Sequence, residues 1–344
     1  MKILFLFSIL SLAVSCNQSN NTSKTPVLIA NEGFAEASEL TLDKIRIRDP
    51  YIVPETSTKT YYMYAQMENR ADANEKGVEV YSSKDLKTWT GPDPVFTLPE
   101  KFWANHQVWA PEVHMYKDNY YLFVTLSNMD TLPTPRPIQT ENWPKQVKRA
   151  SQVFVSKSPR GPFKPFDNKP HTPVEWSSLV GTLFMEDGIP YMIFCHEWTQ
   201  IVDGTMELVR LSDDLSEPLS EPVTLFKASD AEWVLPVQEH GKITDGPFLY
   251  KASSWKLIMI WSSFGTNGYA IGQAISENGR IAGPWTQANL IFKENGGHGM
   301  IFKTFENQLV LLFHQPNIGP QERAQMYLIE EVEDRLVLVS KLNE

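Results

Sequence analysis

The sequence contains little cysteine, no excess of basic charge and no hydrophobic run long enough to span a membrane. Two of its 344 residues are cysteines, so a framework of several disulfides is excluded. The 31 Lys and Arg residues are outnumbered by 41 Asp and Glu, for a formal net charge of −10. Nucleic-acid binding needs a basic footprint, and we therefore expect no nucleic-acid partner. The apolar run at residues 3–14 is too short for a transmembrane helix.

The N-terminus carries an export signal. Lys2 precedes the apolar run, which ends in Leu12-Ala13-Val14-Ser15-Cys16, a segment that resembles the bacterial lipobox. We expect residues 1–15 to be a signal peptide and residues 16–39 to be a lipidated Cys16 with a flexible tether. An ordinary secretory signal is the alternative. In the lipoprotein, the lipid on Cys16 would be the only membrane contact. The absence of an acidic run after Cys16 favours the periplasm over the cell surface. Cys195 is left without a partner, which is typical of a buried structural thiol.

Five segments that run from a small or acidic residue into an apolar hairpin recur along the chain. They start at Arg48, Trp109, Val180, Thr244 and His298. An interval of roughly 50–70 residues with several strands per unit is typical of a β-propeller. The innermost strands of a propeller start near one channel, so we expect the leading residues to meet in one pocket. We take these leading residues to be Asp49, Glu112, Val180, Asp245 and His298.

A second repeat lies downstream of each hairpin. An alternating strand followed by a Ser-led turn begins at Gly77, Ser151, Met206 and Ile271, and a strand without that turn begins at Ala324. Strand-length apolar runs dominate, and no helical period persists beyond two turns. We predict an all-β, five-bladed propeller over residues 40–344, each blade a four-stranded antiparallel sheet, in a monomeric protein.

Several motifs resemble those of glycoside hydrolase family 43, the five-bladed propeller glycosidases that act mostly on arabinose- and xylose-containing glycans. The resemblance rests on Arg48-Asp49-Pro50, Trp109-Ala110-Pro111-Glu112-Val113, Gly181-Thr182-Leu183-Phe184, Asp245-Gly246-Pro247 and Gly297-His298-Gly299. It implies an oligo- or polysaccharide substrate and an inverting mechanism. In that mechanism one carboxylate activates water and an acid about 6.5–9.5 Å away protonates the leaving oxygen.

The resemblance assigns roles to particular carboxylates. Asp49 matches the general base, although an Asp before Pro is also common in turns. Asp245 matches the general acid, but the family usually has Glu before Gly-Pro, and the shorter Asp would draw the carboxyl back by about 1.5 Å. Glu197, at the far end of the third hairpin, is the reserve candidate for the acid.

The larger departure from the family pattern is at Val180. The family has an Asp there that modulates the pKa of the acid, and valine can neither ionise nor accept a hydrogen bond. Glu175, a few residues upstream, is a candidate replacement. A weakly active or non-hydrolysing carbohydrate-binding homologue therefore stays open beside the glycosidase, and an unrelated propeller that serves as an interaction scaffold is a third reading.

The remaining site expectations concern substrate contacts and a cation. The resemblance implies that Glu112 contacts sugar hydroxyls or supports Asp49. The other candidates for substrate contact are Trp103, Trp109, His196 and Trp198. His298 matches a family histidine that helps to hold Ca²⁺ or Na⁺ through waters, with a hydrogen-bonded core histidine as the alternative. We expect no organic cofactor. The loop at 130–147, which includes Trp143, is expected to close over the pocket.

Overall fold

The computed structural model describes residues 39–132 and 143–342. The predicted signal peptide, Cys16 and nearly all of the tether lie outside the described residues, as does the middle of the predicted loop. The predicted boundary at residue 40 stays a prediction. No helix in the described ranges is long and apolar enough to cross a membrane.

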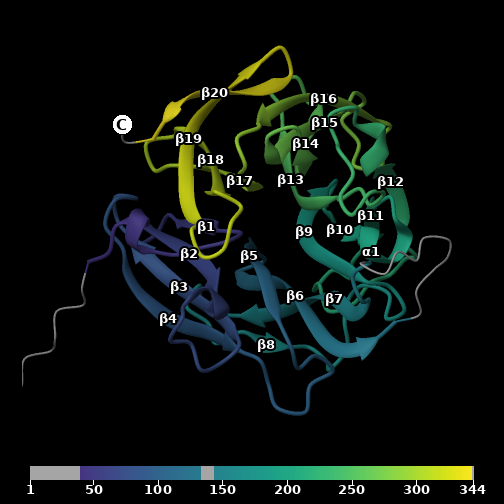
Figure 1. Ribbon diagram of the computed structural model, residues 1–344. Coiled ribbons are helices and arrows are strands. Elements are labelled where there is room, and N and C mark those ends of the chain that lie inside the picture. The colour runs from purple at the N-terminus through teal and green to yellow at the C-terminus, as the bar shows by residue number, and fades with distance from the viewer. Residues whose placement is uncertain (1–38, 133–142, 343–344) are drawn as a thin grey trace, which may run out of the picture. The chain divides into compact units, whose positions relative to one another are not determined.

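The described chain forms five four-stranded sheets, and each sheet is built from consecutive strands (Figure 1). Blade one is β1 (Tyr51–Glu55), β2 (Thr60–Gln66), β3 (Gly77–Ser83) and β4 (Thr90–Thr97). Blade two is β5 (Val108–Tyr116), β6 (Asn119–Thr131), β7 (Val147–Ser156) and β8 (Lys164–Pro165). Blade three is β9 (Ser178–Glu186), β10 (Ile189–His196), β11 (Thr205–Arg210) and β12 (Val223–Lys227). Blade four is β13 (Asp245–Lys251), β14 (Leu257–Gly265), β15 (Gly268–Ser276) and β16 (Trp285–Phe292). Blade five is β17 (Gly297–Lys303), β18 (Leu309–Gln315), β19 (Arg323–Val332) and β20 (Arg335–Lys341).

Every strand pair within a blade is antiparallel. The helical elements in the described ranges are short: η1 (Leu42–Lys44), η2 (Met67–Asn69), α1 (Trp198–Ile201) and η3 (Ala228–Asp230). The predicted all-β propeller of four-stranded blades is therefore confirmed.

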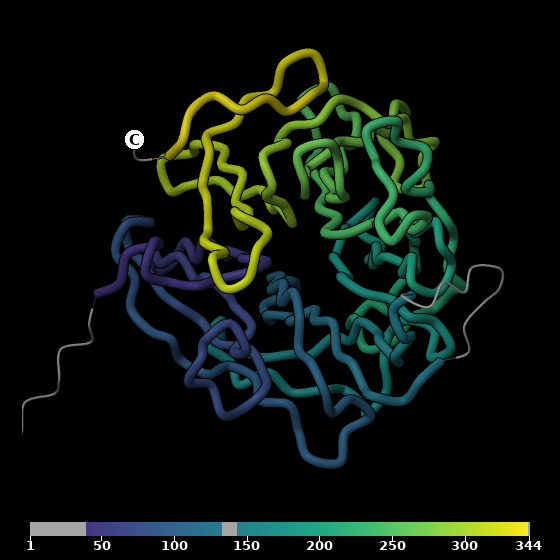
Figure 2. Tube along the Cα trace, viewed as in Figure 1, coloured from purple at the N-terminus to yellow at the C-terminus, as the bar shows by residue number. Residues whose placement is uncertain are grey.

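The first strands of the blades form a closed ring. β1 contacts β5, β5 contacts β9, β9 contacts β13, β13 contacts β17, and β17 contacts β1. Figure 2 shows a yellow segment of blade five beside the purple start of the described chain. The Arg323 guanidinium donates to the Asp43 carbonyl across this closure. Buried residues of blades one and five, among them Ile47, Met63 and Leu312, share one apolar cluster across this closure.

Tight turns join several of the paired strands, and their residues suit the backbone that is required. Lys117-Asp118, Asp187-Gly188 and Glu333-Asp334 each supply two consecutive residues at positive φ between antiparallel strands. Two such residues are characteristic of the type I′ hairpin, whose twist matches that of the flanking strands.

One backbone feature recurs at the inner start of all five blades. Asp49, Ala110, Val180, Gly246 and His298 each adopt a left-handed conformation, with φ between 47° and 56°. In blades two to five the register with the second strand shifts across this residue, as in a β-bulge, which bends a strand and re-aims a side chain. We call these five positions the lead residues.

The lead residues correct two of the sequence-based assignments. Asp49, Val180 and His298 lead their blades as predicted, but Ala110 leads blade two in place of Glu112, and Gly246 leads blade four in place of Asp245. The repeat length locates a blade, but it does not locate the single bulged residue. Glu112 therefore lies two positions past the lead, whereas Asp245 lies one position before it.

Candidate active site

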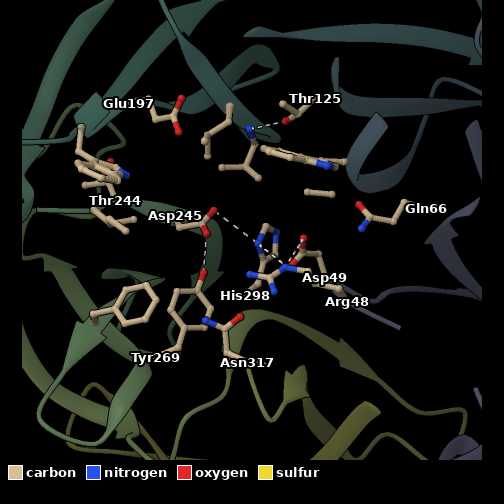
Figure 3. Close-up of a pocket in the computed structure, with 17 residues that line it drawn as sticks. Arg48, Asp49, Gln66, Thr125, Glu197, Thr244, Asp245, Tyr269, His298 and Asn317 are labelled. Carbon is tan, nitrogen blue, oxygen red and sulfur yellow. Dashed lines mark hydrogen bonds and ion pairs between the residues drawn. The ribbon is translucent and has the colours of Figure 1, made fainter. Parts of the chain in front are cut away.

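A cavity of about 260 Å³ opens among the lead residues. All five blades contribute to its wall (Figure 3). The predicted site residues that line it are Asp49, Trp109, Val180, Glu197, Trp198, Asp245 and His298. Residues spread over about 250 positions of the sequence thus meet in one pocket, as the repeat predicts.

Two carboxylates meet one imidazole at the centre of this cavity. His298 Nδ1 lies 3.3 Å from Oδ1 of Asp49 and 3.5 Å from Oδ1 of Asp245. Because both oxygens lie this close to one nitrogen, their separation is at or below the lower end of the ~6.5–9.5 Å carboxylate spacing of inverting glycosidases. Figure 3 shows His298 between the two aspartates.

Asp49 is buried and surrounded by nitrogen atoms. Its backbone N–H donates to His314 Nδ1 at 3.2 Å, and Arg48 Nε lies 3.9 Å from its Oδ2. Burial raises the pKa of the Asp49 carboxyl, but the charges of His298 and Arg48 lower it below its usual range. Asp49 is thus held as a carboxylate, the form that a general base needs.

Asp245 is held by a tyrosine and by its own chain. The Tyr269 hydroxyl donates to Oδ2 at 2.6 Å, and the Gly246 N–H donates to Oδ1 at 2.9 Å. Tyr269 reaches this position because a Cβ at Gly297 would lie 2.4 Å from its ring. Any larger residue at position 297 would displace the phenol.

Val180 leads blade three and contributes no polar group to the cavity. Its side chain is buried, and its N–H donates to Thr125 Oγ1 at 2.8 Å. A β-branched residue at φ 50° is a steric outlier. Glu175 does not replace the missing acid, because it is exposed and lies outside this cavity.

Glu197, the reserve acid, lies on the opposite side of the cavity from Asp49 (Figure 3). It forms an ion pair with Arg149 and accepts a 2.7 Å hydrogen bond from Ser177. The Arg149 guanidinium also stacks on the Trp109 ring, 4.4 Å from its centroid. A carboxylate tied to a buried cation is better suited to a fixed anion than to a proton donor.

Trp109 and Trp198 present aromatic surface to the cavity. Trp198 makes an edge contact with Trp143 at a centroid distance of 5.1 Å, so the described end of the predicted loop does reach this side of the site. Gly241 packs against the other side of the indole, where a Cβ would lie 2.1 Å from a ring atom. The Trp198 ring is thus held in place from two directions, as a sugar-stacking platform requires.

Three residues expected to contact substrate do not line the cavity. Glu112 is buried between blades and pairs with His114 at 3.0 Å. His196 stacks on Trp176 at 4.0 Å and bonds Gln200. Trp103 donates its indole N–H to Gln152 at 2.5 Å. The structure thus places these three predicted contacts outside the cavity lining, each with a partner of its own.

The donor set does not fit direct binding of a metal ion. Within residues 39–132 and 143–342, no group of three or more His, Cys, Asp or Glu side chains is arranged to hold one. His298 Nδ1 is occupied by the two aspartates. Binding of Ca²⁺ or Na⁺ through waters at His298 stays a prediction.

Sequence reasoning missed several cavity residues, including Gln66, Tyr269 and Asn317. Tyr269 begins the third strand of blade four, Gln66 ends the second strand of blade one, and Asn317 follows β18. The only available signal was the hairpin register, which places the end of each second strand beside the start of the first.

Comparisons with known proteins agree with this architecture. The sequence model described as "Glycosyl hydrolases family 43" matches residues 44–333. The crystal structure of an endo-arabinase from Bacteroides thetaiotaomicron VPI-5482 superposes with a TM-score of 0.75 and 36% identity, over 86% of this chain and 98% of that one. An endo-1,4-beta-xylanase from the same organism shares the fold, with a TM-score of 0.69 and 22% identity over 88% and 97%.

One curated relative matches over a shorter stretch. The extracellular endo-alpha-(1->5)-L-arabinanase 1 of Bacillus subtilis (strain 168) is 33% identical over 60 residues. That match covers 16% of this chain and only 19% of the relative.

Proposed function

The chain belongs to glycosyl hydrolase family 43, and on that premise we propose that it hydrolyses arabinose- or xylose-containing polysaccharides with inversion at the anomeric carbon. Linear α-1,5-arabinan is the first candidate substrate. The structural relative at 36% identity is an endo-arabinase, and the B. subtilis relative is an endo-α-(1→5)-L-arabinanase. The observation that carries the proposal is the convergence of Asp49 and Asp245 on His298 in one cavity.

In the proposed reaction, the Asp49 carboxylate removes a proton from water as the water attacks the anomeric carbon. Asp245 gives a proton to the departing glycosidic oxygen, and the new C–O bond forms on the face opposite the broken one. Neighbouring cations favour the ionised form of Asp49 and outweigh the opposing effect of its burial. Tyr269 donates to Oδ2 of Asp245, and the Gly246 N–H donates to Oδ1, the oxygen on the His298 side.

The first experiment combines a substrate panel with Asp49→Asn. We expect release of arabino-oligosaccharides from linear arabinan by the wild-type protein, with the inverted anomer seen first by NMR. Asp49→Asn should lower kcat by about 10²- to 10⁴-fold, because general-base catalysis of water attack is lost. Turnover of no arabinan, xylan or aryl pentoside by wild type would reject the hydrolase.

A second experiment separates the two candidate acids. Asp245→Asn and Glu197→Gln are compared on aryl arabinofuranosides with good and poor leaving groups. Loss of the true acid spares the good leaving group, which departs without protonation. We expect this pattern for Asp245→Asn. The same pattern in Glu197→Gln would move the acid to blade three.

A non-hydrolysing carbohydrate-binding protein is the second candidate function, and Val180 is the observation that favours it. The cavity lacks a carboxylate at the lead of blade three, where the family resemblance implies one. Oligosaccharide binding without turnover, measured by calorimetry, would support this candidate over the hydrolase.

We also propose export as a lipoprotein anchored through Cys16, since Leu12-Ala13-Val14-Ser15 precedes it and the B. subtilis relative is extracellular. Cys16→Ala should move the protein from the membrane fraction to the soluble fraction. Protease accessibility in intact cells then distinguishes the periplasm from the cell surface.

A further inference from the structure

The second strand of each blade carries one position that faces the start of the next blade. Four of these positions pair with the residue just before a lead: Thr125 with Trp109, Cys195 with Leu179, Ser262 with Asp245, and His314 with Gly297. In blade one the same register places Gln66 there, two residues beyond the Tyr51–Tyr64 pair. The propeller therefore offers five equivalent side chains for comparison.

Three of the five side chains form a hydrogen bond to the neighbouring blade, and we call this contact a clasp. Each accepts the backbone N–H of the next lead residue: Thr125 from Val180 at 2.8 Å, Ser262 from His298 at 2.8 Å, and His314 from Asp49 at 3.2 Å. The hydrogen bonds satisfy N–H groups that the bulge has removed from the strand ladder. A polar side chain at this register thus has an architectural use in those blades.

Gln66 has the same register but a different environment. It is 7% exposed, and its Nε2 donates to Asn69 Oδ1 at 3.2 Å. Its Oε1 is buried without a hydrogen-bond partner, and so is Nδ2 of Asn69. Exchanging oxygen and nitrogen in both amides preserves their mutual bond and still leaves one polar end of Gln66 unused.

A buried polar group without a partner is costly, so its retention calls for an explanation. Gln66 lines the cavity that holds Asp49 and Asp245, and Figure 3 shows it on the Asp49 side, away from Glu197. Gln66 does not clasp the next blade, and Figure 3 shows its amide directed toward the cavity.

We propose that Gln66 is a substrate-binding residue whose free amide end hydrogen-bonds a hydroxyl of the sugar on the Asp49 side of the cavity. This proposal rests on the glycosidase function argued above. A carboxamide is matched to a hydroxyl because each can donate or accept. Asn69 fixes the amide from behind, so little rotamer freedom is lost on binding.

The test is Gln66→Met, which keeps the length of the side chain and removes both polar atoms. With linear α-1,5-arabino-oligosaccharides we expect KM to rise about 10-fold with kcat changed less than about twofold, as for one lost hydrogen bond. Calorimetry in the Asp49→Asn background should show the same loss of affinity without turnover.

Ser262→Ala is the matched control, because it removes a clasp at the equivalent register. It should lower the unfolding temperature by a few degrees, since the buried His298 N–H loses its acceptor. Gln66→Met removes an orphaned acceptor but leaves Asn69 Oδ1 without its donor, so it should lower the unfolding temperature by a similar amount. The two variants should therefore differ in KM and affinity for the oligosaccharides, and not in stability.

Each other outcome has a defined meaning. Unchanged KM and affinity in Gln66→Met, with wild type active on arabinan, overturns the role of Gln66 and leaves the hydrolase standing. A fall in kcat at constant KM would assign Gln66 to the attacking water and also overturn hydroxyl binding. Wild-type protein that neither cleaves nor binds the oligosaccharides fails the proposed function itself.

Discussion

The phenolic hydroxyl of Tyr269 donates a 2.6 Å hydrogen bond to Oδ2 of Asp245. Burial raises the pKa of Tyr269 well above its ordinary value, and the charges of Asp245 and Asp49 raise it further. The phenol therefore stays protonated and acts as a donor throughout the range in which a glycosidase works. Tyr269 comes from the third strand of its blade, so the proposed acid depends on a contact that no local motif encodes.

Tyr269→Phe removes this hydrogen bond and keeps the ring. We expect kcat to fall about 10-fold or more, because a misplacement of about 1 Å near the reacting atoms can cost 10²-fold. The loss should be larger for aryl arabinofuranosides with poor leaving groups than for good ones. Thermal unfolding provides the folding control, and an equal loss on all leaving groups would argue against support of the acid by Tyr269.

The charge around Asp49 predicts activity at low pH. A general base works when ionised, and the pKa of Asp49 is lowered by His298 and Arg48 despite its burial. Protonation of Asp49 should lower kcat/KM on the acid side of the pH profile (the acid limb). This decrease should occur below the titration range of an ordinary aspartate, which is centred near pH 3.9.

His298→Asn removes one of these charges and tolerates the left-handed backbone. The pKa of Asp49 should rise, so the acid limb should move to higher pH. The pH dependence of kcat/KM measures the shift, with circular dichroism to confirm that the variant is folded at each pH. A limb that stays in place or moves to lower pH would contradict the assigned effect of His298 on Asp49.

The fold was predictable because its information is local and repeated. Each hairpin can be recognised in the sequence by a strand-length apolar run and by turn residues such as Asp187-Gly188. The site was predictable only in part. Asp49 and His298 are lead residues beside Pro and Gly. The lead of blade two is Ala110, and the repeat length does not resolve a shift of two residues to Glu112.

The cavity residues that the sequence did not predict are positioned by contacts between segments far apart in the chain. Tyr269 reaches Asp245 because Gly297 of the next blade leaves room for its ring. Gln66 reaches the cavity through a register shared by all the blades, but its free amide end is visible only when its hydrogen bonds are counted. His196 was predicted to contact substrate because of its place at the end of a hairpin, but its ring stacks on Trp176. Sequence spacing carries no information about such choices.

Val180 combines a missing charge with backbone strain, and two substitutions separate these effects. Val180→Asn relieves the cost of a β-branched residue at φ 50°, and it should stabilise the protein by about 1 kcal/mol. Val180→Asp gains the same backbone relief, but burial of its carboxylate offsets part of it. It also supplies a carboxylate at the lead of blade three. Chemical unfolding measures the first effect, and kcat measures the second.

We expect Val180→Asp to raise kcat above that of Val180→Asn if the absence of a third acid limits the rate. Equal kcat values for the two variants would show that the charge at this position is not limiting. Lower stability of both variants would contradict the strain argument.

His171 provides a pH-dependent contribution to stability outside the active site. It is 4% exposed, with Nε2 bonded to the Leu215 carbonyl at 3.1 Å and Nδ1 accepting the Val153 N–H at 3.4 Å. Both nitrogens are thus satisfied by a neutral ring. Burial lowers the pKa of His171 from 6.5 to about 4.

Between pH 6.5 and about pH 4 His171 binds a proton in the unfolded chain but not in the folded protein. The free energy of unfolding should therefore fall by about 3 kcal/mol as pH drops through this window, and the contribution should level off below it. His171→Gln, whose amide can donate to the Leu215 carbonyl, should remove this part of the slope while losing some stability at neutral pH. Urea unfolding of both proteins across the window measures the difference, and parallel pH profiles would exclude His171 as its source.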